Sequence, residues 1–274
     1  MHETPIVKFI NCEARPLAVV LGTNEIASAI AVRLNYNGCR VILSHDQTTP
    51  VLRRKMAFHD ALYEEAVEID GVRGRRADSI VDIAEAFAQP QAVVAVTPLQ
   101  LMDLIVMRRP DALVDARLQN CRITPNLRGV AAFSVGVGGE FQTSVNCDAA
   151  VSTQPLGAAV EEAPQAEAFV HAQREGVWLT PLDVGARVYR GVALGRHAGV
   201  RVFAPKDGVL RGIARDGCFV PRGARLLEID PRGRTPNCAG TDEQGRRVAN
   251  AVMSAIRHVE AQRERRSAFE PVLS

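Results

Sequence analysis

The sequence predicts an α/β fold: a doubly wound sheet in the N-terminal half, then a small all-β domain and a C-terminal helix. Two observations lead to this prediction. From residue 16 to residue 153, short apolar runs alternate with segments of helical periodicity, which is typical of a mainly parallel sheet covered by helices. Further on, the pattern of a ten-residue segment that begins at Gly185 recurs at Gly217. Each copy contains a turn, a valine, a second turn and an apolar strand, so the repeat predicts a two-fold β-sandwich.

The α/β half begins with a βαβ unit. The apolar run Leu17–Leu21 is followed by a helix over residues 24–34, for which Asn24 is a suitable N-cap, and Cys39–Leu43 is the second strand. Thr49 before Pro50 predicts that another helix begins after that strand. The remaining segments complete a Rossmann-like domain, with strands at 91–97, 111–117, 129–136 and 148–153 and helices at 79–87 and 99–108.

Composition divides the chain into four regions. A Rossmann-like α/β domain is expected over residues 1–155 and an Ala/Glu/Pro/Gln-rich linker over 156–175. A barrel-sandwich-like β domain is expected over 176–236, and a C-terminal helix and tail over 237–274. The helix has an apolar face, formed by Val248, Val252, Ile256 and Val259.

The bulk composition is that of an ordinary globular protein. Of the 274 residues, 47% are hydrophobic and 23% charged, and the net charge of +2 gives no reason to expect nucleic acid as a partner. No apolar run reaches the roughly 18 residues that a membrane helix needs, and the first residues lack the basic start and apolar run that a signal peptide would have. We therefore expect a cytoplasmic protein that does not bind membranes. The six cysteines show no metal-ligand spacing, so we expect mainly free thiols and no metal site.

The turn after the first strand is the first candidate binding site. A dinucleotide fingerprint has three small residues here, and the positions are occupied by Gly22, Asn24 and Ala27. Asn24 places a side chain where a pyrophosphate would approach, which favours a structural turn over ordinary NAD binding. Asp46, at the end of the second strand, is a candidate ribose-binding acid. The N–H groups at the helix start are expected to be open to an anion.

The other strand ends form the second candidate site. Asp115, Arg117, Gly136 and Gly138 fall where open α/β sheets bind ligands, and Arg117 could hold a phosphate. The alternative is that Asp115 and Arg117 pair with neighbours and that the glycines only turn the chain. Arg53 is a further candidate, although its sequence context favours a solvated surface arginine. We predict no catalytic residue, because no nucleophile–base or paired-carboxylate arrangement is visible.

The order of these motifs resembles the YqeB-type family of selenium-dependent molybdenum hydroxylase system proteins. The resemblance runs from Val19 to about Ala255 and is carried by short segments: Gly22–Ala27, Pro50–Arg54, Leu113–Arg117, Gly136–Gly138, Ala204–Gly212 and Asp230–Gly233. It implies an accessory or maturation protein for a molybdenum-containing hydroxylase. Such a protein would bind its client enzyme, or an anionic cofactor of molybdopterin type, and would be a binding protein more than an enzyme. The chain departs from the family pattern at Asn24 and at Glu140, an acid beside the presumed anion site.

The duplicated segment also resembles the biotinyl/lipoyl barrel-sandwich fold. Carrier domains of that fold present a lysine on the hairpin that joins their halves. The equivalent stretch here, Leu194–Gly199, has no lysine, and Lys206 lies in a different turn. We therefore expect no covalent biotin or lipoate. Two alternatives remain open at this point: an NAD(P)-dependent oxidoreductase, and a non-catalytic scaffold that docks a partner through the β domain. The ligand, the client and the formation of homo-oligomers are not determined by the sequence.

Overall fold

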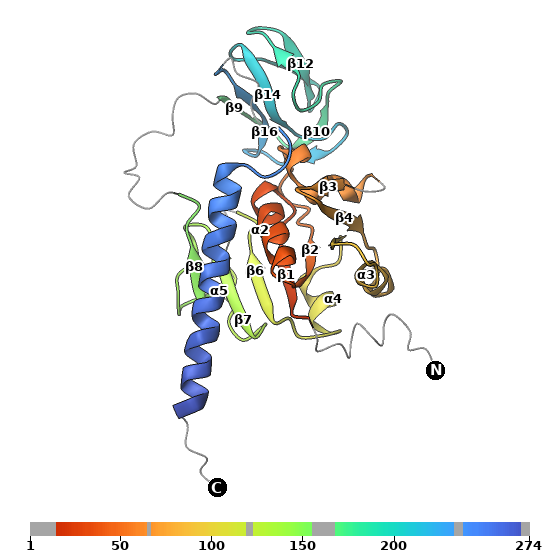
Figure 1. Ribbon diagram of the computed structural model, residues 1–274. Coiled ribbons are helices and arrows are strands. Elements are labelled where there is room, and N and C mark those ends of the chain that lie inside the picture. Colours follow the sequence, from red (N-terminus) through yellow and green to blue (C-terminus); the bar gives the residue numbers. More distant parts are fainter. Residues whose placement is uncertain (1–14, 65–66, 119–122, 155–167, 233–237, 270–274) are drawn as a thin grey trace.

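The computed structural model describes residues 15–64, 67–118, 123–154, 168–232 and 238–269, with side chains of the last helix as far as residue 261. An α/β domain with an eight-stranded sheet carries, at one end, a β domain of two four-stranded sheets (Figure 1). Among the described helices, none is both long enough and apolar enough to cross a membrane.

The eight-stranded sheet confirms the predicted mainly parallel arrangement. Its order is β3-β4-β5-β2-β1-β6-β7-β8, and only the pairing of β3 with β4 is antiparallel. The order reverses between β1 and β6, which is where doubly wound sheets open a crevice. The strands are β1 (Leu17–Leu21), β2 (Arg40–Ser44), β3 (Val67–Ile69), β4 (Val72–Arg76), β5 (Val93–Thr97), β6 (Ala112–Asp115), β7 (Phe133–Val137) and β8 (Ala149–Val151).

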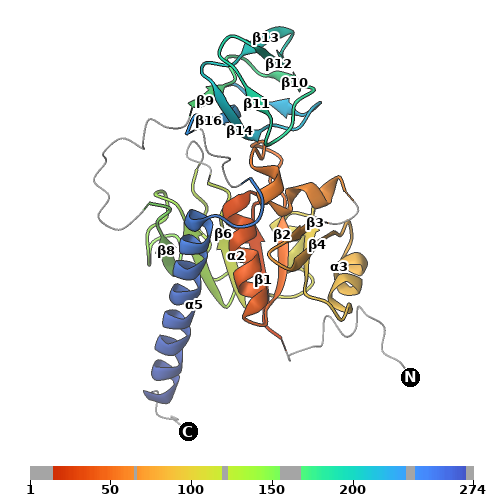
Figure 2. The same cartoon turned by 45° about the horizontal axis from the view of Figure 1, so that its top comes forward.

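Helices cover both faces of this sheet, and each face has its own apolar core. On one face, α2 (Glu25–Tyr36) lies beside α5 (Glu243–Phe269). The predicted apolar face of α5 is confirmed, because Val248, Val252 and Ile256 are buried in the core that α2 shares. The opposite face is covered by α3 (Ile80–Phe87) and the short α4 (Leu101–Ile105). The last helix therefore completes the α/β domain, although the β domain separates it from that domain in sequence (Figure 2).

The helix predicted to begin at Thr49 is wrong. Two 3-10 turns, η1 (Arg54–Met56) and η2 (Phe58–Leu62), follow an irregular stretch instead. The carbonyl oxygen of Leu52 accepts a hydrogen bond from the backbone N–H of Ile213, at 2.9 Å, in the β domain. Pairing with another domain thus replaces the intrahelical bond that this carbonyl would have made.

The β domain shows that the sequence repeat is a structural repeat. Strand β9 begins at Ala168 and β13 at Val200, an offset of 32 residues (200 − 168), which is also the offset between Gly185 and Gly217 (217 − 185). The same offset relates β10 to β14, β11 to β15 and β12 to β16. The strands are β9 (Ala168–His171), β10 (Gly176–Leu179), β11 (Arg187–Val188), β12 (Ala193–His197), β13 (Val200–Phe203), β14 (Gly208–Ile213), β15 (Phe219–Val220) and β16 (Arg225–Asp230).

The two sheets of the β domain are antiparallel and enclose one core. Their orders are β13-β12-β10-β15 and β11-β14-β16-β9. If each strand of one sheet is replaced by the equivalent strand of the other repeat, the order of the second sheet results. Trp178 and Leu210, at equivalent positions, are fully buried between them. Because β9 pairs with β16, the β domain begins at residue 168, inside the predicted linker; residues 155–167 lie outside the described ranges.

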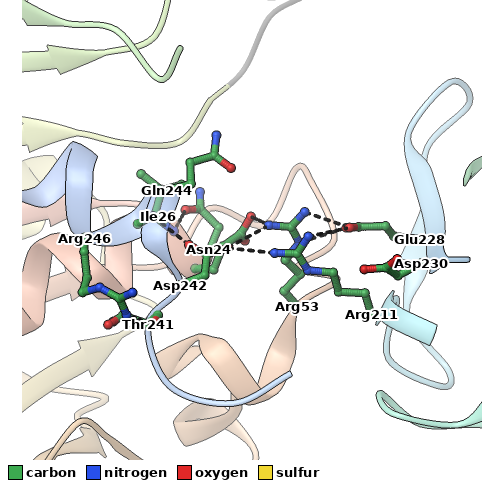
Figure 3. A network of polar contacts seen from close by, with 12 residues as sticks. Asn24, Ile26, Arg53, Arg211, Glu228, Asp230, Thr241, Asp242, Gln244 and Arg246 are labelled. Atoms are coloured by element: carbon green, nitrogen blue, oxygen red, sulfur yellow. Dashed lines mark hydrogen bonds and ion pairs between the residues drawn. The ribbon is translucent and has the colours of Figure 1, made fainter. Parts of the chain in front are cut away.

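A buried ion network fixes the β domain to the α/β domain (Figure 3). The Arg53 guanidinium donates to both carboxylate oxygens of Glu228 in β16, at 2.9 and 2.8 Å, and lies 3.4 Å from Asp242 at the start of α5. Arg211 of β14 reaches the same Asp242 at 2.9 Å. Residues from three parts of the chain thus share one set of charges, which holds the two domains in a defined relation.

Candidate functional site

Asn24 fills the turn where a dinucleotide would bind. Its side-chain oxygen accepts from the N–H groups of Ile26 and Ala27, at 3.0 and 2.9 Å. Its amide nitrogen donates to the carbonyl oxygen of Ala116, 2.8 Å away, across the crevice between β1 and β6. The expectation that the N–H groups at the helix start are open to an anion is therefore wrong for Ile26 and Ala27, because the cap uses both.

Gly22 closes the same crevice from the other side. Its φ of +106° suits glycine, and a Cβ at this position would lie 3.1 Å from the Ala116 carbonyl oxygen. The β1 and β6 loops therefore approach each other closely. Gly22 therefore has a structural role, because it lets the two loops contact each other. The sequence pattern favours such a structural turn over ordinary NAD binding.

Three of the predicted strand-end residues do come together. The buried Asp115 accepts from Arg117 at 3.0 Å (Nε–Oδ1) and 2.5 Å (Nη2–Oδ2). This hydrogen bonding raises the pKa of Arg117, with a further contribution from the nearby Asp46. Asp46 itself accepts from the Thr48 hydroxyl at 2.8 Å. Arg117 is thus permanently charged, but carboxylates offset much of that charge.

Gly136 in β7 and Gly138 just after it differ in role. Gly136 has no room for a side chain, because a Cβ there would overlap the Phe141 ring. Gly138, with φ of +120°, lines a small cavity of about 30 Å³ together with Arg117 and Glu140. The acid at position 140 therefore does lie beside the presumed anion site.

Arg53 does not take part in this group. Its guanidinium is directed into the interdomain network with Glu228 and Asp242, and the residue is 9% exposed. Because Arg53 is buried, the alternative that it is a solvated surface arginine is also wrong. Its partner Glu228 lies 175 residues away, so only the folded chain could identify the pair.

Two adjoining cavities lie at the carboxyl ends of the strands. The strand-end cavity, of about 210 Å³, is lined by Ser44, His45, Asp46, Gln100, Arg117 and Asn126 among others. The interdomain cleft, of about 380 Å³, is lined by residues of both domains, including His45, His59, Tyr63, Arg76, Arg215 and Phe219. His45 borders both, so the two cavities adjoin at this side chain.

A histidine pair joined by one hydroxyl lies in the interdomain cleft. The Oγ1 atom of the buried Thr23 is 3.1 Å from Nδ1 of His45 and 3.1 Å from Nδ1 of His59. The two ring centroids are 4.9 Å apart. Burial lowers the pKa of His59 to about 3, helped by His45, Arg215 and Arg54, and burial also lowers the pKa of His45. Both rings are therefore neutral near pH 7.

The remaining walls of the cleft combine aromatic rings with offset charges. The Arg215 guanidinium lies over the Tyr63 ring, 4.2 Å from its centroid, and pairs with Asp60 at 2.7 Å. Arg76 is held by Asp78 at 2.8 Å. Tyr63 and Phe219 are 57% and 61% exposed. The cleft thus offers aromatic surface and nearly balanced charge.

The four described cysteines have free thiols. Burial raises the pKa of each of them, including Cys218 at the edge of the interdomain cleft. A raised pKa disfavours the reactive thiolate, so these four thiols are expected to be unreactive. Cys12 and Cys121 lie outside the described ranges.

Sequence reasoning did not bring His45 together with Thr23 and His59. Thr23 and His59 are separated by 36 residues, and Arg215 is 155 residues from Asp60. His59 lies a few residues after the helix start predicted at Thr49, and no pattern around it marks it as a site residue. The hairpin-joining stretch was located correctly: β12 and β13 meet at Ala198 and Gly199, both with positive φ.

No family model matches the chain. It is 25% identical over 258 residues to the uncharacterized protein YqeB of Escherichia coli (strain K12), which covers 88% of this chain and 47% of that protein. The chain thus spans about half the length of the curated relative that it matches. The similarity is distant but extends over most of the chain.

Solved structures give weaker likenesses. The product-bound ectoine utilization protein EutE (DoeB) of Ruegeria pomeroyi is 14% identical, with 79% of this chain and 86% of that chain covered and a TM-score of 0.25. A succinylglutamate desuccinylase of Silicibacter sp. TM1040 is 13% identical over the same shares, with a TM-score of 0.22. Likenesses this low carry no argument about fold or function. The similarity to YqeB, although distant, supports the family resemblance that the sequence motifs indicate.

Proposed function

We propose that this chain is an accessory protein of a molybdenum-containing hydroxylase, which binds a molybdopterin-type cofactor instead of catalysing a nicotinamide-dependent reaction. The observation that carries the proposal is the position of Asn24. Its side chain occupies two N–H groups at the start of α2 and bridges to Ala116, where a dinucleotide pyrophosphate would lie. The space for a ligand lies instead in the strand-end cavity and the interdomain cleft.

The two cavities suit the two parts of a phosphate-bearing pterin. The ring would lie in the interdomain cleft, where Tyr63 and Phe219 offer exposed aromatic surface. The phosphate would lie in the strand-end cavity, which is lined by Arg117 and the polar side chains of Gln100 and Asn126. Because Asp115 and Asp46 offset the charge of Arg117, we expect moderate affinity and ready release, as a protein that transfers its ligand requires.

The β domain offers a surface for a client protein, and its resemblance to carrier domains of the barrel-sandwich fold is part of the proposal. Val177 and Leu179 project from one face of β10, and Val177 is paired with the exposed Phe219. Arg196 lies opposite Leu179, so the same face is apolar and basic. This combination favours an apolar partner surface with acidic residues around it.

Purification of the protein from its native host tests this function. Small molecules and proteins that remain bound would be identified by mass spectrometry. We expect a molybdopterin-type compound, a molybdenum hydroxylase, or both. Bound NAD(P) in stoichiometric amount, without either of these, would overturn the proposal in favour of an oxidoreductase.

A further inference from the structure

We propose that the interdomain cleft recognises a planar nitrogen heterocycle through an edge on which a hydrogen-bond donor and an acceptor are adjacent. Lactam heterocycles, such as pterins and hydroxypurines, have such an edge. His45 and His59 are the complementary pair, with one ring donating and the other accepting. The inference rests on the proposed binding function, but it does not depend on molybdenum or on a client enzyme.

The Thr23 hydroxyl imposes opposite tautomers on the two histidines. Within the described structure, the hydrogen-bond partners of Oγ1 are the Nδ1 atoms of His45 and His59, both at 3.1 Å. A hydroxyl has one hydrogen, so it can donate to only one of these nitrogens. Thr23 is 2% exposed, and leaving its hydrogen without an acceptor would be costly. One Nδ1 therefore accepts from the hydroxyl, and the other carries a hydrogen and donates to it.

Opposite tautomers give the cleft one donor and one acceptor. In a neutral imidazole, the nitrogen that does not carry the hydrogen is the acceptor. The ring whose Nδ1 accepts has an Nε2–H donor, and the ring whose Nδ1 donates has an Nε2 lone pair. Neither Nε2 atom has a hydrogen-bond partner in the described part of the chain, and both rings line the cleft.

The surroundings favour a neutral, planar ligand at this point. The charged groups that face the pair are Asp46 beside His45, and Arg54 and Arg215 beside His59. Asp183 binds Arg54 at 2.6 Å, and Asp60 binds Arg215 at 2.7 Å, so these cations are offset. Tyr63 is packed against His59, with ring centroids 5.4 Å apart, and presents an exposed ring to the cleft. Aromatic walls beside neutral polar atoms suit stacking of a heterocycle.

Nitrogen-15 NMR of the histidine side chains, on the full chain at pH 7, tests the tautomers directly. The spectrum distinguishes Nδ1–H from Nε2–H rings, and His45→Gln and His59→Gln variants assign the signals. We expect one ring of each tautomer. In Thr23→Val, which keeps the shape of the side chain, the fixed pairing of tautomers should be lost. Two rings of the same tautomer, or two charged rings, in the unmodified chain would overturn the inference.

Binding of pterin, measured by calorimetry, tests the ligand class. We expect pterin to bind, and 3-methylpterin, which lacks the ring N–H of the lactam, to bind at least about tenfold more weakly. His59→Gln should weaken pterin binding by a similar factor, while His258→Gln on the exposed part of α5 should leave it unchanged. Equal affinity for the two pterins would overturn the inference. If pterin does not bind but a hydroxylase copurifies, this inference fails and the proposed function stands.

Discussion

Replacement of Asn24 by alanine measures how firmly the turn after β1 is closed. The side chain makes three hydrogen bonds: two that cap α2 and one to the Ala116 carbonyl oxygen. Loss of an N-cap costs about 1 kcal/mol, and loss of the bond to Ala116 costs about 1 kcal/mol more. We therefore expect Asn24→Ala to lower the free energy of unfolding by about 2 kcal/mol. For a chain of this size, that corresponds to a fall in Tm of about 5 °C.

Chemical denaturation followed by circular dichroism gives this free energy, and Asn24→Ser is the matched control. Serine keeps an oxygen that can cap the helix but is too short to bridge to Ala116, so about half of the loss is expected. Equal stability of Asn24→Ala and the unmodified chain would refute the view that this side chain closes the crevice. A serine variant as unstable as the alanine variant would show that the loss of stability is not shared between the helix cap and the hydrogen bond to Ala116.

Three further predictions concern the interdomain ion network, the histidine pair and the strand-end cavity. Glu228→Gln removes the carboxylate charge that Arg53 binds at 2.8 Å in a buried site, and should lower the free energy of unfolding in urea by about 3 kcal/mol. Asp183→Asn, at a half-exposed pair, should cost less than about 1 kcal/mol. Because the pKa of His59 is lowered to about 3 in the folded chain, the unfolded chain binds more protons below about pH 6.5. Stability should therefore fall from about pH 6.5 toward pH 3, by up to about 1.4 kcal/mol per pH unit, and a pH series of urea midpoints for His59→Gln should show a shallower fall. Arg117→Ala should weaken calorimetric binding of a phosphorylated pterin about tenfold and leave unphosphorylated pterin unaffected, whereas equal loss for both would remove Arg117 from the phosphate site.

Most of the fold could be predicted from the sequence, because local patterns mark most of its helices and strands. Apolar runs located β1, β2 and β5, and the 32-residue repeat located the β domain. The hairpin of β3 and β4 was missed because β4 is Val-Arg-Gly-Arg-Arg, a polar segment that reads as a surface loop. Its one local signal was Asp70-Gly71, where both residues have positive φ in the turn.

The candidate site was less predictable, because contacts between distant segments create it. Parallel strands bring their carboxyl ends to one edge, so Asp46, Asp115 and Arg117 could be grouped from sequence alone. The use of Arg53 in domain docking depends on a glutamate in another domain. The pairing of His45 with His59 depends on a shared hydroxyl from a third segment.

Hydrogen–deuterium exchange with bound pterin tests most directly whether the ligand lies in the interdomain cleft and not at the turn after β1. With saturating pterin, we expect slower exchange in peptides that cover residues 45–63 and 211–220, which line the cleft from the two domains. The amides of Ile26 and Ala27, already bonded to Asn24, should not change. Protection confined to the peptide that contains Ile26 and Ala27, with none in the cleft segments, would contradict this placement.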